Sequence, residues 1–167
     1  METIKILPTE KADQLLIWAK AQQFEREVFT GRETCRLKKW WGYEAEFYFD
    51  RSHVYPRQTI ESDNFLASYR DQLAPLSDSV LLYYYQVGGT IGEHLDKKCF
   101  DKWVTLINLV DAEADLFGNR PATKFRWSRV NYELHHGEVV RFDSRVLHSV
   151  PPLKSARYSL QFRNIAF

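Results

Sequence analysis

The chain has 167 residues, of which 23 are Lys or Arg and 22 are Asp or Glu, so its formal net charge is +1. This length is typical of one domain, and the 44% apolar and 27% charged residues exclude a long disordered chain. The longest unbroken apolar run, Val80 to Tyr85, has six residues, whereas a membrane-spanning helix needs about 20. The near-neutral charge excludes a strong overall attraction to nucleic acid.

Cysteine usage and the start of the chain indicate the compartment. Cys35 and Cys99 show no CxxC spacing, and residues 1–5 lack the basic start and long apolar stretch of a signal peptide. A reduced, intracellular setting is therefore the default. We expect one domain over residues 1–167, in the cytoplasm and without a membrane partner.

Two helices are predicted in the first half of the chain. Apolar residues recur at roughly helical spacing from just after Thr9 to Val28, with Thr9 as a plausible N-cap and Gly31 at the end of the pattern. A second amphipathic segment begins at Ser62 and is stopped by Pro75.

The rest of the chain reads as short strands. Residues 38–41 and 45–49 are predicted to pair as a hairpin across Gly42. After Pro75, β-branched or aromatic runs separated by turn residues are found at 80–85, 103–110, 124–127, 130–134, 139–142 and 158–162. Regularly spaced short strands predict an antiparallel sandwich or barrel.

His94 and Asp96 are the first residues with metal-binding spacing. In a strand, side chains two residues apart project from the same face. His148, just after the predicted strand 139–142, is the candidate third ligand from a distant strand. Two imidazoles and one carboxylate form the facial triad of non-haem Fe(II) oxygenases, with open positions for a cosubstrate and O2. An HxD tripeptide alone favours the plainer alternative, a surface His beside a solvated Asp.

A pair of polar residues after His148 changes that balance. Arg157 and Ser159 would share one face of the last predicted strand. A guanidinium offers two parallel hydrogen bonds to a carboxylate, and a hydroxyl adds another. The pair therefore suits the distal carboxylate of 2-oxoglutarate, whose other end chelates iron.

The ordered set His94-x-Asp96, His148 and Arg157-x-Ser159 resembles the Fe(II)- and 2-oxoglutarate-dependent dioxygenases. The resemblance runs from about Leu81 to Arg163, roughly half of the chain, and it implies a mainly β fold with N-terminal helices. In that fold, residues 79–167 form a double-stranded β-helix (jelly roll) that residues 1–78 support.

The resemblance also implies the chemistry. His94, Asp96 and His148 would be the catalytic metal ligands for Fe(II), with 2-oxoglutarate as cosubstrate and O2 as oxidant. The implied reaction hydroxylates a C–H bond of an organic substrate, or removes a methyl group oxidatively, and releases succinate and CO2.

Two branches of this superfamily look similar to the chain. Tyr85-x-x-Gly88 and the ending 157–163 resemble the alkylation-repair (AlkB-type) demethylases, by which Tyr85 and Arg157 would hold the distal carboxylate and Arg163 would lie near the chelating end. Tyr83, Ser159 and Gln161 differ from the residues usual in that branch. Residues 104–109 and 157–160 resemble the prolyl-hydroxylase-like branch, which hydroxylates peptides and small molecules.

We therefore expect a small-molecule or peptide substrate, with an alkylated nucleobase as the alternative. Basic and aromatic residues in 36–43 would suit a stacking platform for unpaired bases. The plainer interpretation of that segment is a half-buried hairpin whose Trp residues cover the core. A non-catalytic β-roll that binds a ligand is a further alternative, and the sequence makes no prediction of oligomeric state.

Overall fold

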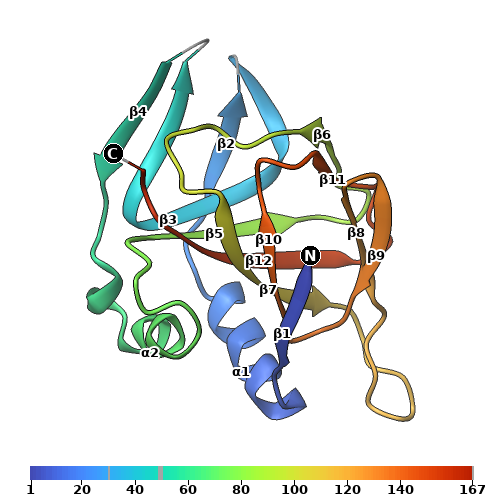
Figure 1. Ribbon diagram of the computed structural model, residues 1–167. Coiled ribbons are helices and arrows are strands. Elements are labelled where there is room, and N and C mark those ends of the chain that lie inside the picture. Colours follow the sequence, from blue (N-terminus) through green and yellow to red (C-terminus); the bar gives the residue numbers. More distant parts are fainter. Residues whose placement is uncertain (30, 49–50, 167) are drawn as a thin grey trace.

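The computed structural model describes residues 1–29, 31–48 and 51–166, and these form two antiparallel sheets and two α-helices (Figure 1). Within these residues the larger sheet has the strand order β1-β10-β7-β12-β5-β3-β2, with β4 paired to β3. Its strands are β1 Glu2–Ile6, β2 Glu25–Phe29, β3 Arg32–Tyr48, β4 Arg51–Pro56, β5 Ser79–Tyr85, β7 Trp103–Asp111, β10 Glu138–Asp143 and β12 Ala156–Arg163. The smaller sheet has the order β6-β11-β8-β9. Its strands are β6 Ile91–His94, β8 Thr123–Trp127, β9 Val130–Leu134 and β11 His148–Val150.

Both helices, α1 (Thr9–Lys20) and α2 (Asn64–Leu73), cover one face of the larger sheet (Figure 1). Because side chains alternate along a strand, Tyr158 and Leu160 of β12 pack in the apolar cluster that contains the helices. Leu81 and Tyr83 of β5 instead face the smaller sheet. Among the described residues, neither helix is long and apolar enough to cross a membrane.

The first helix is shorter than predicted. It ends at Lys20, and the following residues 25–29 form β2, so Val28 belongs to a strand. Phe24 packs against aromatic rings of the sheet, with its ring centroid 6.0 Å from that of Tyr158. Thr9 is the first helical residue rather than the N-cap, a position that Pro8 takes without a side-chain hydrogen bond. Apolar residues this sparse fit a helical and an extended period alike, which explains the error.

The second helix begins after a 3-10 turn, Ile60–Ser62, and not within it. Asp63 is its N-cap, and the Asp63 carboxylate accepts a hydrogen bond of 3.0 Å from the backbone N–H of Leu66. The helix ends at Leu73, two residues before Pro75, as predicted.

The predicted hairpin across Gly42 is instead one long strand, β3, with a bend. Gly42 has φ +75°, a backbone conformation that favours glycine. Residues 36–42 pair with β5, and residues 43–48 pair with β4. A Cβ at Gly42 would overlap the backbone carbonyl of Asp78. The glycine therefore lets β3 pass close to the neighbouring chain while it changes partners.

Gly42→Ala is expected to destabilise the fold by about 2–5 kcal/mol. The left-handed backbone costs an alanine about 1–2 kcal/mol, and displacement of the Asp78 carbonyl adds about 1–3 kcal/mol. Gly118→Ala is the matched control, because Gly118 has φ +80° but open space around its Cβ. Urea unfolding of both variants measures the difference, and equal losses would contradict the close approach at Gly42.

Candidate functional site

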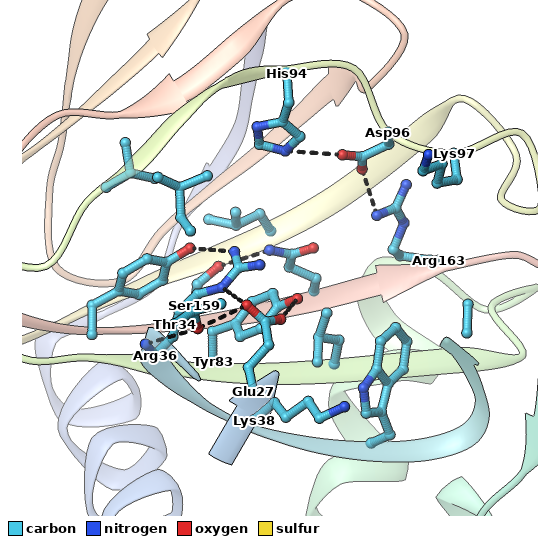
Figure 2. A pocket seen from close by; sticks show the side chains of 18 of the residues that line it. Glu27, Thr34, Arg36, Lys38, Tyr83, His94, Asp96, Lys97, Ser159 and Arg163 are labelled. Carbon is cyan, nitrogen blue, oxygen red and sulfur yellow. Dashed lines mark hydrogen bonds and ion pairs between the residues drawn. The ribbon is translucent and has the colours of Figure 1, made fainter. Parts of the chain in front are cut away.

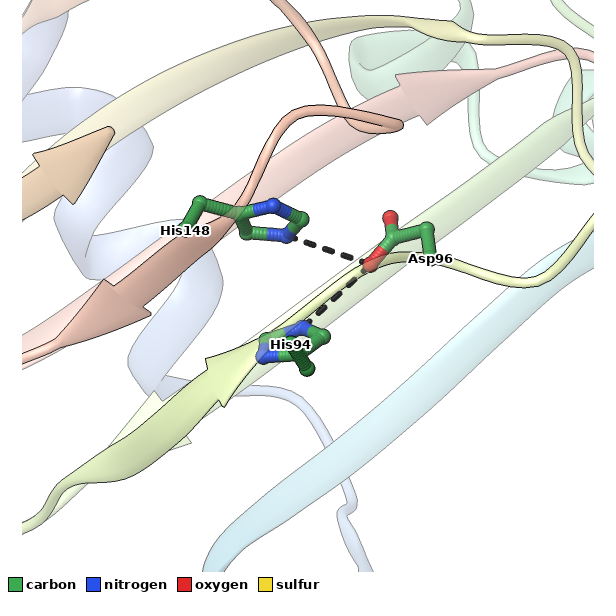
Figure 3. A group of neighbouring side chains, drawn as sticks. All are labelled: His94, Asp96 and His148. Carbon is green, nitrogen blue, oxygen red and sulfur yellow. Dashed lines mark ion pairs between the residues drawn. The ribbon is translucent and has the colours of Figure 1, made fainter. Parts of the chain in front are cut away.

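His94, Asp96 and His148 lie next to one another (Figure 3). All three line a cavity between the two sheets. His94 ends β6 and His148 begins β11, and the two residues are direct partners in the antiparallel ladder. Asp96 lies in the segment after β6, where its backbone N–H donates to the carbonyl of Ser144 at 3.0 Å. The structure thus brings together three side chains that the sequence spreads over 55 positions, from 94 to 148.

The atoms of the triad have the spacing of metal ligands. Oδ1 of Asp96 lies 3.3 Å from Nε2 of His94 and 3.1 Å from Nε2 of His148. Adjacent ligands of an octahedral ion with bonds of about 2.1 Å lie about 3 Å apart. The three ligand atoms all lie within 4.8 Å of one another, so the three residues can bind one ion.

The outer nitrogens of both imidazoles set their tautomers. Nδ1 of His94 donates to the carbonyl of Gly92, and Nδ1 of His148 donates to the carbonyl of Val146, each at 2.8 Å. A neutral ring that donates through Nδ1 presents an unprotonated Nε2. Three electron-pair donors then converge with no hydrogen between them, an arrangement that a cation would stabilise.

Asp96 is held in its ionised form. Burial alone would raise the pKa of Asp96, but Arg163 and the two imidazoles outweigh it and hold this pKa well below its usual range. Nη1 of Arg163 lies 2.6 Å from Oδ2 of Asp96. Because Arg163 occupies Oδ2, the other carboxylate oxygen is left to face the imidazoles. Without a metal ion, a proton can take the place between His94 and Asp96. Burial lowers the pKa of His94, but the hydrogen bonds that the protonated ring makes to Asp96 and to the Gly92 carbonyl outweigh burial and raise this pKa.

The cavity beside the triad has a volume of about 1030 Å³, and alternate residues of β12 line its floor. Arg157, Ser159 and Arg163 all face it, as does Gln161 between them. The strand register sets Arg157 beside Tyr85 of β5. Figure 2 shows that Ser159 lies on the same side as Arg36 and Glu27, across from His94 and Asp96.

Arg157 is a buried cation without a counter-ion. Its side chain is 1% exposed, and among the described residues no carboxylate forms an ion pair with it. Nε donates to Oδ1 of Asn108 at 2.5 Å, and Nη2 has no hydrogen-bond partner. Burial lowers the pKa of Arg157, and the nearby Arg36 lowers it further against the opposing effect of Tyr85. An unpaired buried charge is costly, so an anionic ligand fits this end of the cavity.

Sequence reasoning missed Asn108 as a site residue. Asn108 is fully buried, and its Nδ2 donates to Oγ1 of Thr123 and to the carbonyl of Leu134, both at 3.0 Å. These bonds fix the amide so that its oxygen faces Arg157. The feature of the sequence that could have indicated Asn108 is the presence of an amide side chain within the apolar predicted strand 104–110.

Glu27 and Arg36 were also missed as cavity residues, although Arg36 was noted as a basic residue near aromatics. Nε of Arg36 lies 2.6 Å from Oε1 of Glu27. They come from β2 and β3 and meet only through the pairing of these strands. No local sequence pattern reports that pairing.

The two tryptophans of the aromatic segment 36–43 are buried. Trp40 and Trp41 are on opposite faces of β3 and are 8% and 1% exposed. Trp41 stacks on Trp18 of α1 at 5.5 Å between ring centroids, and Trp40 stacks on Phe100 beside the cavity at 6.0 Å. Both indoles therefore serve the interior, as the plainer interpretation predicted.

No family model matches the chain, and no curated protein matches it in sequence. Its fold, however, matches solved structures. A Pseudomonas putida prolyl-4-hydroxylase superposes with a TM-score of 0.61 and 18% identity, covering 96% of this chain and 89% of that one. An oxidoreductase of the 2OG-Fe(II) oxygenase family from Burkholderia pseudomallei gives a TM-score of 0.55 and 13% identity, over 90% and 76% of the two chains.

A prolyl hydroxylase from Trichoplax adhaerens, in complex with a peptide fragment of the hypoxia inducible factor oxygen degradation domain, is similar as well. It gives a TM-score of 0.56 and 14% identity, over 94% of this chain and 77% of that one. The chain therefore has the fold of the 2-oxoglutarate–Fe(II) oxygenases. The mainly β fold with N-terminal helices that the sequence resemblance implies is confirmed.

His94→Ala, Asp96→Ala and His148→Ala are each expected to lower Fe(II) affinity by more than about 100-fold, because loss of a partner outside the ligand set alone costs about 10–100-fold. Anaerobic titration of the purified protein with Fe(II) measures this affinity. His135→Ala is the control, since His135 is exposed and lies outside the cluster. Wild-type affinity in a triad variant would mean that the metal binds elsewhere.

Proposed function

We propose that the protein is an Fe(II)- and 2-oxoglutarate-dependent dioxygenase that hydroxylates a C–H bond of an organic substrate. The net result would be either a hydroxylated product or the oxidative removal of a methyl group. One cavity contains both a convergent His94–Asp96–His148 triad and the unpaired buried cation of Arg157. The triad fits Fe(II), and the cation fits the distal carboxylate of a dianionic cosubstrate. This combination carries the proposal, and the shared fold supports it.

At the metal end, the chain supplies ligands and their orientation. The triad would hold Fe(II) on one face and leave the opposite positions open for 2-oxoglutarate and O2. When bound, these groups supply the oxidation of an unreactive C–H bond, with release of succinate and CO2. Arg163 orients Asp96 through Oδ2. Phe125 and Phe142 pack against His148, with ring centroids 6.2 and 5.5 Å from its ring, and keep water from that side.

At the cosubstrate end, three side chains have a donor that no hydrogen bond between described residues uses. Asn108 occupies Nε of Arg157, so Nη2 is left for a ligand. The hydroxyl of Ser159 accepts a bond of 3.2 Å from Gln161, and its own hydrogen remains to be donated. The hydroxyl of Tyr85 accepts a bond as well and keeps its hydrogen in the same way. These three residues would bind the distal carboxylate and hold the other end of the cosubstrate toward the triad.

The proposed substrate is a peptide or a small molecule. The Trichoplax prolyl hydroxylase of similar fold is in complex with a peptide fragment, which supports this class. A cavity of about 1030 Å³ is at the upper end of the range for small-molecule sites, about 300–1,000 Å³. It has room for a substrate beside the cosubstrate.

The proposed architecture is a single domain built on a double-stranded β-helix (jelly roll). Its support is the pair of antiparallel sheets that face each other across the cavity. Residues 79–167 would form its core, with residues 1–78 as the supporting part. The free thiols of Cys35 and Cys99 support a cytoplasmic setting.

Anaerobic addition of Fe(II) and 2-oxoglutarate is expected to produce a weak visible charge-transfer band, which requires both oxygens of the chelating end on the iron. The band should be lost in His148→Ala. In air, succinate formation is then followed with panels of peptides, small molecules and methylated oligonucleotides.

Stimulation by methylated oligonucleotides alone would favour the AlkB-type demethylase. A bound metal with no succinate from any panel would favour a non-catalytic ligand-binding β-roll. Folded protein without the charge-transfer band would refute the dioxygenase proposal.

Arg157→Met is expected to raise the Kd for 2-oxoglutarate by about 10–100-fold, because a hydrogen-bonded charge contributes about 1.5–3 kcal/mol. The Fe(II) affinity should not change. The ligand-free variant should unfold at the same or a higher temperature than the wild type, because it removes an uncompensated buried charge. Calorimetry under anaerobic conditions and thermal unfolding check the two parts.

Arg141→Met is the control for that variant. Arg141 stacks over the ring of Trp103 at 4.5 Å and is exposed, away from the cavity. An unchanged 2-oxoglutarate affinity in Arg157→Met would remove Arg157 from the proposed site.

A further inference from the structure

One row of the cavity floor carries three polar side chains on three neighbouring strands. The register pairs Arg36 of β3 with Tyr85 of β5, and Tyr85 with Arg157 of β12. Directly paired residues of adjacent strands project from the same face of a sheet. The row therefore reads Arg–Tyr–Arg across the cavity, with a tyrosine that is 2% exposed in the middle.

Both arginines contact Tyr85, one at its hydroxyl and the other at its ring. Nη1 of Arg36 donates to the Tyr85 hydroxyl at 3.0 Å. The guanidinium of Arg157 lies 5.4 Å from the centroid of the Tyr85 ring, within the range of a cation–π contact. Because the hydroxyl oxygen already accepts a bond, the phenol hydrogen is the group that it can still offer to a ligand.

Arg36 is itself fixed before any ligand arrives. Oε1 of Glu27 accepts from Nε of Arg36 at 2.6 Å and from the hydroxyl of Thr34 at 3.1 Å. The Arg36 guanidinium lies 3.8 Å from the ring centroid of Tyr83, whose hydroxyl donates to Oε2 of Glu27 at 2.7 Å. Figure 2 shows Glu27, Thr34, Arg36 and Tyr83 gathered in one closed group.

The ion pair between Arg36 and Glu27 is largely buried, so it differs from a surface ion pair. The side chains of Arg36 and Glu27 are 16% and 12% exposed, and at that depth the loss of hydration offsets much of the attraction between the charges. What such a closed network does supply is orientation, because it fixes a donor without further loss of conformational freedom on binding.

We propose that Glu27 and Arg36 are positioning residues of the cosubstrate site: Glu27 fixes Arg36, and Arg36 orients the Tyr85 hydroxyl to donate its hydrogen to the distal carboxylate of 2-oxoglutarate. The inference rests on the proposed function. It extends the site to the β2–β3 hairpin, outside the stretch from 81 to 163 that carries the sequence resemblance.

A double-mutant cycle tests whether Arg36 acts through Tyr85. Arg36→Met, Tyr85→Phe and the double variant are loaded with Fe(II) under anaerobic conditions, and the Kd for 2-oxoglutarate is measured by calorimetry. Each single variant is expected to raise this Kd by about tenfold, the effect of one hydrogen bond to a charged group. The double variant should exceed Tyr85→Phe by no more than about twofold, because the two residues act as one unit.

Two results would overturn the inference. An additive, about 100-fold loss in the double variant would mean that Arg36 acts on the ligand by itself. An unchanged Kd in Arg36→Met would mean that it has no role in binding. The Fe(II) affinity of each variant reports folding, since the triad does not contact Arg36 in any described hydrogen bond or ion pair.

If Arg36→Met fails to fold, the double-mutant cycle is repeated with Glu27→Gln, an isosteric change, in place of Arg36→Met. Glu27→Gln is expected to raise the Kd several-fold in the wild-type background and to have no effect in the Tyr85→Phe background. Glu33→Gln is the matched control, because Glu33 pairs with Arg26 at 3.2 Å on the exposed side of the same hairpin. A loss of thermal stability without a change in Kd in Glu27→Gln would show a structural role only, and would overturn the inference.

Failure of the proposed function gives a different result. Wild-type protein that binds Fe(II) but not 2-oxoglutarate would overturn both proposals. Wild-type protein that binds both, with an additive cycle, would overturn the role of Arg36 alone.

Discussion

The register of β12 between β5 and β7 is the constraint on which both the core and the candidate site depend. Alternation sends Tyr158 and Leu160 toward the helices, while Arg157 and Ser159 face the cavity. A slip of one residue would bury the arginine under the helices and turn the apolar residues into the cavity. The many apolar contacts of β12 on its helix side therefore fix the position of the polar groups on its other side.

The cavity contains two buried charges, of which one is compensated by neighbouring side chains and the other is not. Asp96 has Arg163 at 2.6 Å and two imidazoles beside it, so its charge is compensated in the absence of any ligand. Within the part of the chain that the structure describes, Arg157 has the neutral amide of Asn108 and the face of Tyr85 beside it, and no carboxylate. The first arrangement keeps a carboxylate ready for a cation, and the second keeps a cation ready for an anion. This asymmetry gives the cavity a direction along which a dianion with a chelating end can be oriented.

The sequence predicted six of the C-terminal strands, β5, β7, β8, β9, β10 and β12, because each is a compact run of β-branched or aromatic residues. It also singled out the triad, since the HxD spacing is a local signal and His148 follows a predicted strand. Strands such as β1, exposed along its whole length, and β11, only three residues long, carry no such pattern. Arg36 and Asn108 enter the site through pairing between distant strands, and that information is not present in any short window of sequence.

The contact between Asp96 and Arg163 has a consequence for folding. His94 and His148 belong to the smaller sheet, whereas Arg163 ends β12 of the larger one. An ion bound by the triad would thus be tied, through one carboxylate, to both sheets at once. Since a ligand that binds only the native state stabilises it by an amount that grows with the logarithm of the free-ligand concentration, a bound ion would also stabilise the contact between the two sheets. An ion in the triad would then also slow proteolysis, because it lowers the fraction of molecules in which the two sheets have separated.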